Sequence, residues 1–336
     1  MTVRDARLII ADLAFAAPLV TAAGTIDTRR VTLLRVEDHE GVVGWGEASP
    51  LPGWPGPGFD DVHKSLEQWI ESGFAQVPPY GPARAAIEGA LLDIAAQRNG
   101  MSVARKLHAD AVDTVAVNGL VDATDPEQVE ADTARAVAEG FQTIKLKVAT
   151  TSQDVERVAA VRASAPDARI RLDANRGLSH DDAIAFCEAV EPYEIEFIEE
   201  PIPGGVPALE TLQDRVGIAI AADESLAELS IAEYADISLG TLVLKPSALG
   251  NFESLLRLAR SHRLVVTSFL DSAIGLTTAL HVAAAIHGAA QRPMPACGLA
   301  TASRFVADTA DPPAVTNGSL AVPAGSGVGV VPNGEL

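Results

Sequence analysis

From residue 114 onward, short apolar runs alternate with stretches of about ten to fifteen residues that carry apolar positions at helical spacing. Helix start signals, such as Asp125 before Pro126 and Ser179 before His180, mark where these longer stretches begin. Strict alternation of this kind is typical of a parallel α/β barrel and not of a sandwich. The runs expected to form barrel strands are residues 115–121, 143–148, 170–173, 195–198, 218–221, 241–244 and 264–268, with a last short strand near 294–299.

The first hundred residues follow a different plan. Residues 29–36 and 42–48 are typical of two strands joined in a hairpin, and residues 60–72 and 82–97 are typical of two helices. Strands followed by helices, without alternation, indicate an α+β unit.

The two chain ends lack clear helical patterns. The apolar stretch 8–23 follows two arginines, as the core of a targeting signal would, but Asp12 interrupts it. We therefore interpret residues 6–15 as a strand. The Pro/Gly-rich tail 311–336 has no helical period, and we expect it to pack on the N-terminal unit.

Composition narrows the class of protein. Of the 336 residues, 48% are hydrophobic, which suffices for one large α/β domain and a smaller one. The net charge of −20 disfavours a nucleic acid or a membrane surface as partner and fits a cytoplasmic enzyme acting on a small molecule. No uncharged apolar run reaches the ~18 residues of a membrane helix. Cys187 and Cys297 lack metal-type spacing, so we expect free thiols in a reducing compartment.

A charged residue ends each of five successive strand-like runs. A charge at the end of a buried strand is unfavourable unless it meets a partner or a metal. Barrel enzymes place their chemistry at these carboxyl ends of the strands. Because side chains two apart on a strand share a face, Lys145 and Lys147 should both face the barrel interior, as should Arg171, Asp173 and Asn175. The series, in chain order, is Lys145, Lys147, Asp173, Glu199, Asp223 and Lys245.

Three carboxylates between lysines suggest one particular chemistry. Carboxylates from neighbouring strands suit a hard, octahedral divalent cation, Mg²⁺ or in its place Mn²⁺, whereas zinc would require His or Cys ligands. Such an ion acidifies the α-proton of a carboxylate substrate by stabilising the enediolate, and an adjacent lysine can remove that proton. The residues therefore predict proton abstraction next to a carboxylate.

The same motifs resemble the enolase superfamily, in the muconate-lactonizing-enzyme subgroup, over nearly the whole chain. The resemblance implies a modified TIM barrel, (β/α)7β, at residues 109–301, under an α+β capping domain at 1–108 that residues 302–336 complete. The mandelate racemase subgroup is disfavoured because its seventh strand carries a histidine, and residues 264–268 contain none. The motifs are Lys145-x-Lys147, Asp173, Glu199-Glu200-Pro201, Asp223-Glu224-Ser225 and Lys245-Pro246.

Within this subgroup, residues 171–176, 222–226, 245–247 and 272–276 are similar to the o-succinylbenzoate synthases of menaquinone biosynthesis. The resemblance implies a syn-dehydration of 2-succinyl-6-hydroxy-2,4-cyclohexadiene-1-carboxylate through an enediolate. Where many relatives have a glutamate before Ser272, this chain has Asp271, whose role stays open.

The resemblance also implies residue roles. Lys147 would be the base that removes the α-proton and then the acid that protonates the departing hydroxyl. Lys245 would stabilise the enediolate by a cation–π contact. The remaining implied roles are Asp173, Glu199 and Asp223 as metal ligands, Arg171 and Asn175 as their support, and Lys145, Thr267, Ser268, Gly298 and Leu299 as substrate contacts.

Two alternative functions stay open. A racemase or epimerase of N-succinyl or other N-acyl amino acids would use Lys147 and Lys245 as opposed acid and base groups. Dipeptide epimerases carry Asp-x-Asp after the eighth strand, and the uncharged residues 297–301 argue against that substrate only. A barrel that forms a lysine Schiff base needs no metal, but it leaves the three carboxylates unexplained.

One glutamate and two histidines have structural interpretations, and a loop with two tryptophans has two interpretations. Glu200 should point away from the proposed ligands. His281 and His287, six apart on an Ala-rich helix, are expected to be ordinary core or surface residues. Trp45 and Trp54 flank Pro50 and Pro52 in a loop that suits either a lid over the barrel mouth or simple packing.

Overall fold

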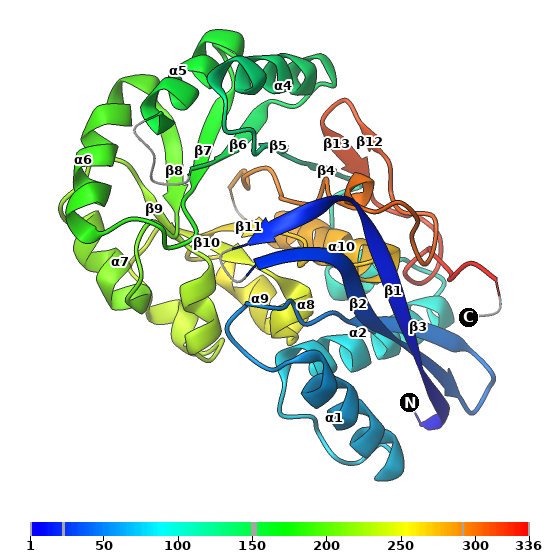
Figure 1. Ribbon diagram of the computed structural model, residues 1–336. Coiled ribbons are helices and arrows are strands. Elements are labelled where there is room, and N and C mark those ends of the chain that lie inside the picture. The colour runs from blue at the N-terminus through cyan, green and yellow to red at the C-terminus, as the bar shows by residue number, and fades with distance from the viewer. Residues whose placement is uncertain (1, 22–23, 149–152, 291, 335–336) are drawn as a thin grey trace.

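The computed structural model describes residues 2–21, 24–148, 153–290 and 292–334. Its largest sheet has seven parallel strands in the order β11-β10-β9-β8-β7-β6-β5 (Figure 1). Neighbours in the sheet follow each other in the sequence, as expected when each strand returns through a crossover. The strands are β5 (Gly119–Val121), β6 (Thr143–Lys147), β7 (Arg169–Asp173), β8 (Ile195–Glu199), β9 (Ile220–Ala222), β10 (Thr241–Leu244) and β11 (Arg263–Val266).

Two isolated parallel bridges connect the edges of this sheet. Val117, before β5, pairs with Cys297, and Thr267, after β11, pairs with Gly298. The predicted last strand near residues 294–299 is thus reduced to these two bridges, yet it links the first barrel strand to the seventh. The predicted class, a modified TIM barrel with an α+β capping domain, is confirmed.

The predicted strand 115–121 is wrong as a single element. The chain forms β4 (Thr114–Ala116), leaves the strand at Val117 and Asn118, and then forms β5. The reason is that β4 pairs antiparallel with β13 (Ser319–Ala321) of the C-terminal tail, whereas β5 pairs parallel with β6. The two halves of one apolar run therefore belong to different sheets.

Helices cover the outside of the barrel, and the predicted caps hold: Asp125 and Ser179 accept from the backbone N–H groups of Gln128 and Asp182. Only the 3-10 turns η2 (Glu224–Glu228) and η3 (Glu233–Asp236) follow β9, where a full helix was expected. The others are α4 (Pro126–Ala138), α5 (Asp154–Ser164), α6 (His180–Val190), η1 (Glu191–Tyr193), α7 (Gly205–Gln213), α8 (Pro246–Leu249), α9 (Phe252–Leu258), α10 (Ala273–Ala289) and η4 (Ala302–Arg304).

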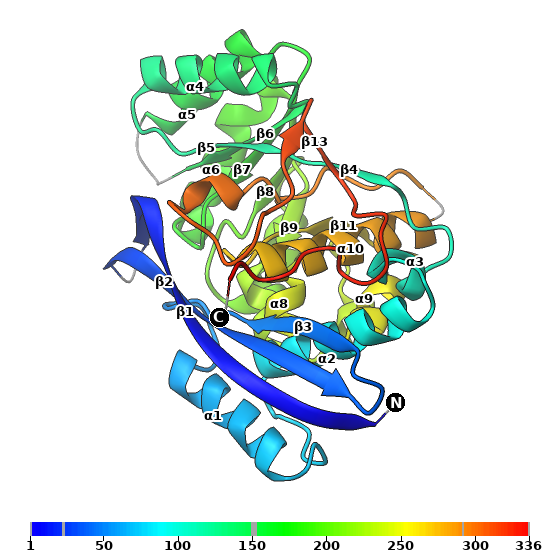
Figure 2. The ribbon, with the colours of Figure 1, turned by 90° about the vertical axis from the view of Figure 1, so that its right-hand side faces the viewer.

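The capping domain packs three strands against two main helices, with helix α1 farthest from the barrel (Figure 2). Gly44 and Gly46 let β3 approach α2 closely, because a Cβ at either position would lie about 2 Å from the α2 carbonyls of Ala90 and Ala86. The predicted strand 6–15 lies within β1, and residues 22–23 of the apolar stretch lie outside the described part. The elements are β1 (Val3–Thr21), β2 (Gly24–Asp38), β3 (Val43–Ala48), α1 (Phe59–Glu71), α2 (Gly81–Arg98) and α3 (Val103–Leu107).

The C-terminal segment from residue 302 onward, which includes the tail, contacts both the barrel and the capping domain. Its strands β12 (Val315–Thr316) and β13 join β4, while Phe305 stacks on Phe15 of β1 with ring centroids 5.1 Å apart. Farther along, Gly327 bridges to Ser102 before α3. The domain boundaries at 108/109 and 301/302 stay predictions, and residues 335–336 of the tail lie outside the described part.

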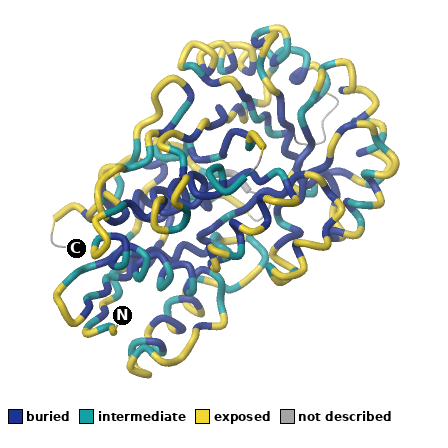
Figure 3. Tube along the Cα trace, turned by 180° about the vertical axis from the view of Figure 1, so that it is seen from behind, coloured by how far each residue is buried: buried dark blue, intermediate teal, exposed yellow. Residues whose placement is uncertain are grey.

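Helix α10 is buried over most of its length, from Ala273 to Ile286. It packs against β3 of the capping domain on one side and β11 of the barrel on the other. Buried segments run through the middle of the molecule and exposed ones follow its outline (Figure 3). Within the described residues, no helix has the length and apolar character needed to cross a membrane.

His281 on α10 makes stability depend on pH. Its Nδ1 accepts from the backbone N–H of Ala104 and its Nε2 donates to the Val328 carbonyl, so the ring is held neutral. Burial lowers the pKa of His281 to about 4, below its ordinary value of 6.5. The unfolded chain therefore binds up to one more proton than the folded chain between about pH 6.5 and pH 4. The free energy of unfolding consequently falls by up to about 3 kcal/mol as pH falls through that window.

We expect His281→Gln to flatten the decline of the unfolding free energy between about pH 6.5 and 4 by about one proton. Urea titrations at several pH values measure this slope. The same substitution at exposed His39 is the control, and an unchanged slope in His281→Gln would contradict the prediction.

Candidate active site

Three of the five lysines in the sequence lie at the carboxyl ends of barrel strands, Lys145 and Lys147 on β6 and Lys245 directly after β10. On β6, Lys145 Nζ lies 2.8 Å from Asp173 Oδ2 and 2.8 Å from Glu199 Oε1, and Lys147 Nζ lies 3.4 Å from the same Asp173 oxygen. Strand register explains this, because Lys147 pairs with Asp173 and Asp173 with Glu199 across β6, β7 and β8. Both lysines therefore face the interior, as the sequence predicts.

Asp223 and Lys245 form the other end of this row of charged side chains. We call it the polar row, and it consists of Lys145, Lys147, Asp173, Glu199, Asp223 and Lys245. Each directly follows its strand, β9 or β10, and the Lys245 ammonium forms an ion pair with Asp223 Oδ1. The same ammonium lies 4.1 Å from the centre of the Trp54 ring, which the capping domain contributes. Lys245 is thus held between a carboxylate and an aromatic face.

The electrostatics of the row differ from one end to the other. Burial acts to raise the pKa of Asp173, but the charges of Lys145 and Lys147 outweigh it and hold that pKa below its usual range. Burial raises the pKa of Asp223 well above its usual range in spite of Lys245, and the charges of Glu224 and Glu199 add to the rise. Burial therefore disfavours the charged form of Asp223, whereas the two lysines favour the charged form of Asp173.

The carboxylates of the polar row are of the chemical type that binds a divalent cation. No three Asp, Glu, His or Cys side chains of the described residues converge as a metal-binding group, and the lysines instead contact the carboxylates of Asp173, Glu199 and Asp223. These three carboxylates are nevertheless buried side by side at successive strand ends. Oxygen donors of this kind are the ones that Mg²⁺ prefers.

Asn175 orients Lys147. Its Oδ1 accepts from Lys147 Nζ at 2.5 Å, while its Nδ2 donates to Glu224 at 2.9 Å. Arg157, which the sequence analysis missed, holds the end of β6 by donating to the Lys147 carbonyl at 2.6 Å and to that of Ala123. A single arginine in a helix gives no sequence signal for such a contact.

Arg171, predicted beside Asn175 as support for the carboxylates, makes other contacts. It donates to Glu196 Oε2 and to the Ala296 carbonyl, each at 2.7 Å, and lies over the Phe197 ring. Glu196 in turn binds Arg263 at the start of β11. Arg171 therefore connects β7 to β8 and to Ala296, which directly precedes the bridge residue Cys297. Its hydrogen bonds do not reach the carboxylates of Asp173, Glu199 and Asp223.

Four of the five residues predicted as substrate contacts, all except Lys145, lie together where the barrel closes. Thr267 Oγ1 donates to the Gly298 carbonyl at 3.1 Å, and the Ser268 N–H donates to the same oxygen at 3.0 Å. Leu299 follows and is buried. Whether they bind substrate stays a prediction.

Two further acidic residues, Glu200 and Asp271, are buried and hydrogen-bonded. Glu200 accepts from the N–H groups of Asp223 and Ser225 and from Arg176, so it holds the turn after β9. Asp271, whose role was open, accepts from Ser49 Oγ at 2.6 Å and from the Phe269 N–H. Asp271 therefore links the capping domain to the loop after β11.

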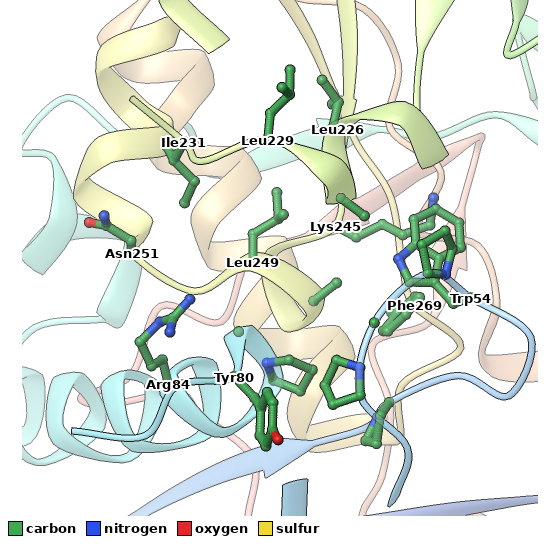
Figure 4. Close-up of a pocket in the computed structure, with 18 of the residues that line it drawn as sticks. Trp54, Tyr80, Arg84, Leu226, Leu229, Ile231, Lys245, Leu249, Asn251 and Phe269 are labelled. Atoms are coloured by element: carbon green, nitrogen blue, oxygen red, sulfur yellow. The ribbon is translucent and has the colours of Figure 1, made fainter. Parts of the chain in front are cut away.

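A cavity of about 530 Å³ lies between the capping domain and the barrel, and it reaches Lys245 and Asp223 (Figure 4). Trp54 and Phe269 gather beside Lys245 at one end, while Arg84 and Asn251 lie at the other. The lining contains neither Lys145 nor Lys147, so the cavity approaches the polar row from the Lys245 end only.

Taken together, the fold and the polar row define a barrel with charged side chains at its strand ends under a second domain, the place where barrel enzymes carry their chemistry. Comparison with known proteins agrees. Residues 5–77 match the mandelate racemase / muconate lactonizing enzyme N-terminal domain, and residues 128–336 match the enolase C-terminal domain-like family. The chain therefore belongs to the enolase superfamily.

Individual relatives differ in activity. An o-succinylbenzoate synthase of Thermobifida fusca is 35% identical over 89% of this chain and 83% of its own length. A D-Ala-D/L-Ala epimerase of Cytophaga hutchinsonii is 29% identical over 79% of each chain. The structure of an Enterococcus faecalis dipeptide epimerase, complexed with Mg and the dipeptide L-Leu-L-Tyr, has a TM-score of 0.87 at 21% identity and covers 98% of this chain and 99% of its own. The last likeness shows the shared fold.

Proposed function

We propose that this enzyme is an o-succinylbenzoate synthase. The placement of Lys147 and Lys245 at opposite ends of one buried row of carboxylates supports proton abstraction next to a carboxylate, which the synthase and a racemase both require. The higher identity and coverage of the Thermobifida synthase, compared with the Cytophaga epimerase, support dehydration as the reaction. The substrate would be 2-succinyl-6-hydroxy-2,4-cyclohexadiene-1-carboxylate, and the product would enter menaquinone synthesis in the cytoplasm.

Lys147 is the group best placed to move the proton. Its side chain is 42% exposed, against 16% for Lys145 and 11% for Lys245, so its amine is the most accessible of the three. In the neutral form it takes the proton from C1 of the substrate, which leaves an enediolate. It then returns that proton to the hydroxyl on C6, the C–O bond breaks, and water leaves as the ring becomes aromatic. One lysine serves both transfers, so the elimination is syn.

Lys245 and a metal ion would stabilise the charge that proton removal creates. The Lys245 ammonium, fixed between Asp223 and Trp54, presents positive charge to the enediolate without transferring a proton. Asp173, Glu199 and Asp223 would hold Mg²⁺ or Mn²⁺, which when bound supplies Lewis acidity toward the substrate carboxylate. Asn175 keeps Lys147 in place through its hydrogen bond.

A racemase or epimerase of N-succinyl or other N-acyl amino acids is the second candidate. It is favoured by the epimerase relative and by the same opposed lysines, since a two-base reaction needs an acid and a base on opposite faces. A dipeptide substrate is less suited, because residues 297–301 offer no carboxylate for an amino group.

A side-by-side assay distinguishes these functions. One preparation with Mg²⁺ is given the cyclohexadiene carboxylate, N-succinyl-L-phenylalanine and L-Ala-L-Glu, and kcat/KM is measured for each. Dehydration at least a hundredfold more efficient than either epimerisation supports the synthase. Efficient racemisation of the N-succinyl amino acid with negligible dehydration would replace it with the second candidate.

Gly298 offers a test of the predicted substrate contacts. A Cβ at this position would lie 2.5 Å from Thr267 Oγ1, so Gly298→Ala must displace that hydroxyl. We expect kcat/KM to fall about tenfold or more while the fold persists, because a misplaced contact disturbs substrate orientation. Gly240→Ala, where a Cβ meets nothing within 4 Å, is the control. Steady-state kinetics equal to those of the native enzyme would argue against the contact.

A further inference from the structure

Arg29 of β2 is fully buried and reaches across the boundary between the capping domain and the barrel. Its guanidinium donates to the carbonyls of Ser49 and Pro50 on one side and of Phe269 and Leu270 on the other, at 2.6 Å for Pro50, 3.2 Å for Phe269 and 3.1 Å for Leu270. An arginine fork that binds four carbonyl oxygens in a buried site fixes the relative position of the segments that carry them. One side chain thus joins two loops that are far apart in sequence.

Each of these loops carries residues of the active site. Ser49 and Pro50 begin the loop that leads to Trp54, whose ring lies against Lys245. Phe269 directly follows Thr267 and Ser268, and its ring meets that of Trp54 edge-on at 5.3 Å. The two aromatic residues are therefore held together by their rings and, through the backbone, by Arg29.

Acidic residues complete this connection. Asp271 accepts from Ser49 Oγ at 2.6 Å, and Glu47 accepts from the N–H groups of Ser272 and Gly275 at 2.9 Å each. Their charges compensate that of Arg29, whose pKa burial lowers to about 10. Leu270 adopts a left-handed backbone with φ of 55°, which a leucine rarely takes unless its surroundings impose it.

We propose that Arg29 is a positioning residue that sets Trp54 and Phe269 over Lys245 and thereby shapes the substrate site from outside it. Without its four contacts, the loop after β3 and the loop after β11 would lose the group that fixes their spacing. The strained geometry at Leu270 would relax, and Thr267 and Ser268 would shift with it. Substrate binding would weaken even though Arg29 touches no substrate.

Two readouts test this role with Arg29→Met and Arg29→Lys. The first is acrylamide quenching of tryptophan fluorescence in the ligand-free protein, with Trp54→Phe identifying the Trp54 contribution among the three tryptophans. The second is the KM of the dehydration reaction, measured well below the melting temperature. This second readout rests on the proposed function. We expect Arg29→Met to raise quenching of Trp54 at least twofold and KM at least fivefold, with Arg29→Lys between it and the native protein.

Arg30→Met is the matched control, because Arg30 is the exposed neighbour that pairs with Asp12. A purely structural role for Arg29 predicts a lower melting temperature with quenching and KM unchanged, and that result would overturn the proposal, as would equal changes in Arg30→Met. If Arg29→Met does not fold, Arg29→Lys carries the test, because it keeps the positive charge but loses the fork that reaches four carbonyl oxygens. Quenching and KM equal to those of the native protein in Arg29→Lys would then count against the proposal.

The two proposals can fail separately. If the native protein turns over none of the substrates named above, the proposed function fails, and the quenching experiment alone judges Arg29. If turnover is normal but Arg29→Met leaves Trp54 unchanged, the proposed function stands and the positioning role falls.

Discussion

Replacing Lys147 with alanine is expected to lower kcat/KM by about four orders of magnitude or more, because the only group proposed to move the proton is lost. The fold should persist, since the Lys147 side chain is partly exposed and its partners Asp173 and Asn175 keep other hydrogen bonds or ion pairs. Exchange of the substrate α-proton with D₂O, followed by NMR, should stop together with dehydration. Lys64→Ala, an exposed lysine on α1, is the control.

Lys147→Arg separates the base from its charge. The arginine keeps positive charge beside Asp173 but cannot act as a base near neutral pH. We expect it to be nearly as inactive as the alanine variant. Activity within tenfold of the native enzyme in either variant would exclude Lys147 as the base.

Glu199→Gln should be the next most damaging change. Glu199 is the middle carboxylate of the row, and both of its oxygens lie 2.8 Å from Lys145. A neutral amide there removes one anionic donor from a buried site, so we expect Mg²⁺ to bind at least a hundredfold more weakly and kcat/KM to fall about a thousandfold. Isothermal titration calorimetry with MgCl₂ measures the binding without reference to activity.

Exposed Glu233 on η3 provides the matched control, Glu233→Gln. Circular dichroism at matched concentration checks the fold of both variants. A Mg²⁺ affinity for Glu199→Gln within threefold of the native value would remove Glu199 from the proposed metal site.

The sequence predicts the barrel strands and the polar row because both depend on local patterns. An apolar run that ends in a charge marks a strand end, and parallel strands of one barrel bring such ends together at one rim. Lys145, Lys147 and Asp173 illustrate this, since their contacts follow directly from the register between β6 and β7. Pairing with a distant segment leaves no such local mark, which is why the division of residues 115–121 between two sheets was missed.

Polar contacts between residues far apart in the sequence could not be predicted for the same reason. Arg29 and Leu270 are 241 positions apart, and Ser49 and Asp271 are 222 apart, yet each pair is hydrogen-bonded. The alternation of side chains along a strand predicts which face of β7 Arg171 lies on. It does not predict its hydrogen-bond partners, Glu196 and Ala296. Side-chain partners depend on how the whole barrel closes.

The most direct test of the central claim is the ultraviolet absorbance of the cyclohexadiene carboxylate during incubation with the purified enzyme, first with Mg²⁺, then with EDTA, and then with Mg²⁺ restored in excess. We predict rapid conversion to o-succinylbenzoate with Mg²⁺, arrest by EDTA and recovery on restoration. Absence of turnover by folded, Mg²⁺-loaded protein would contradict the synthase, and turnover that EDTA leaves unchanged would contradict the role given to the three carboxylates.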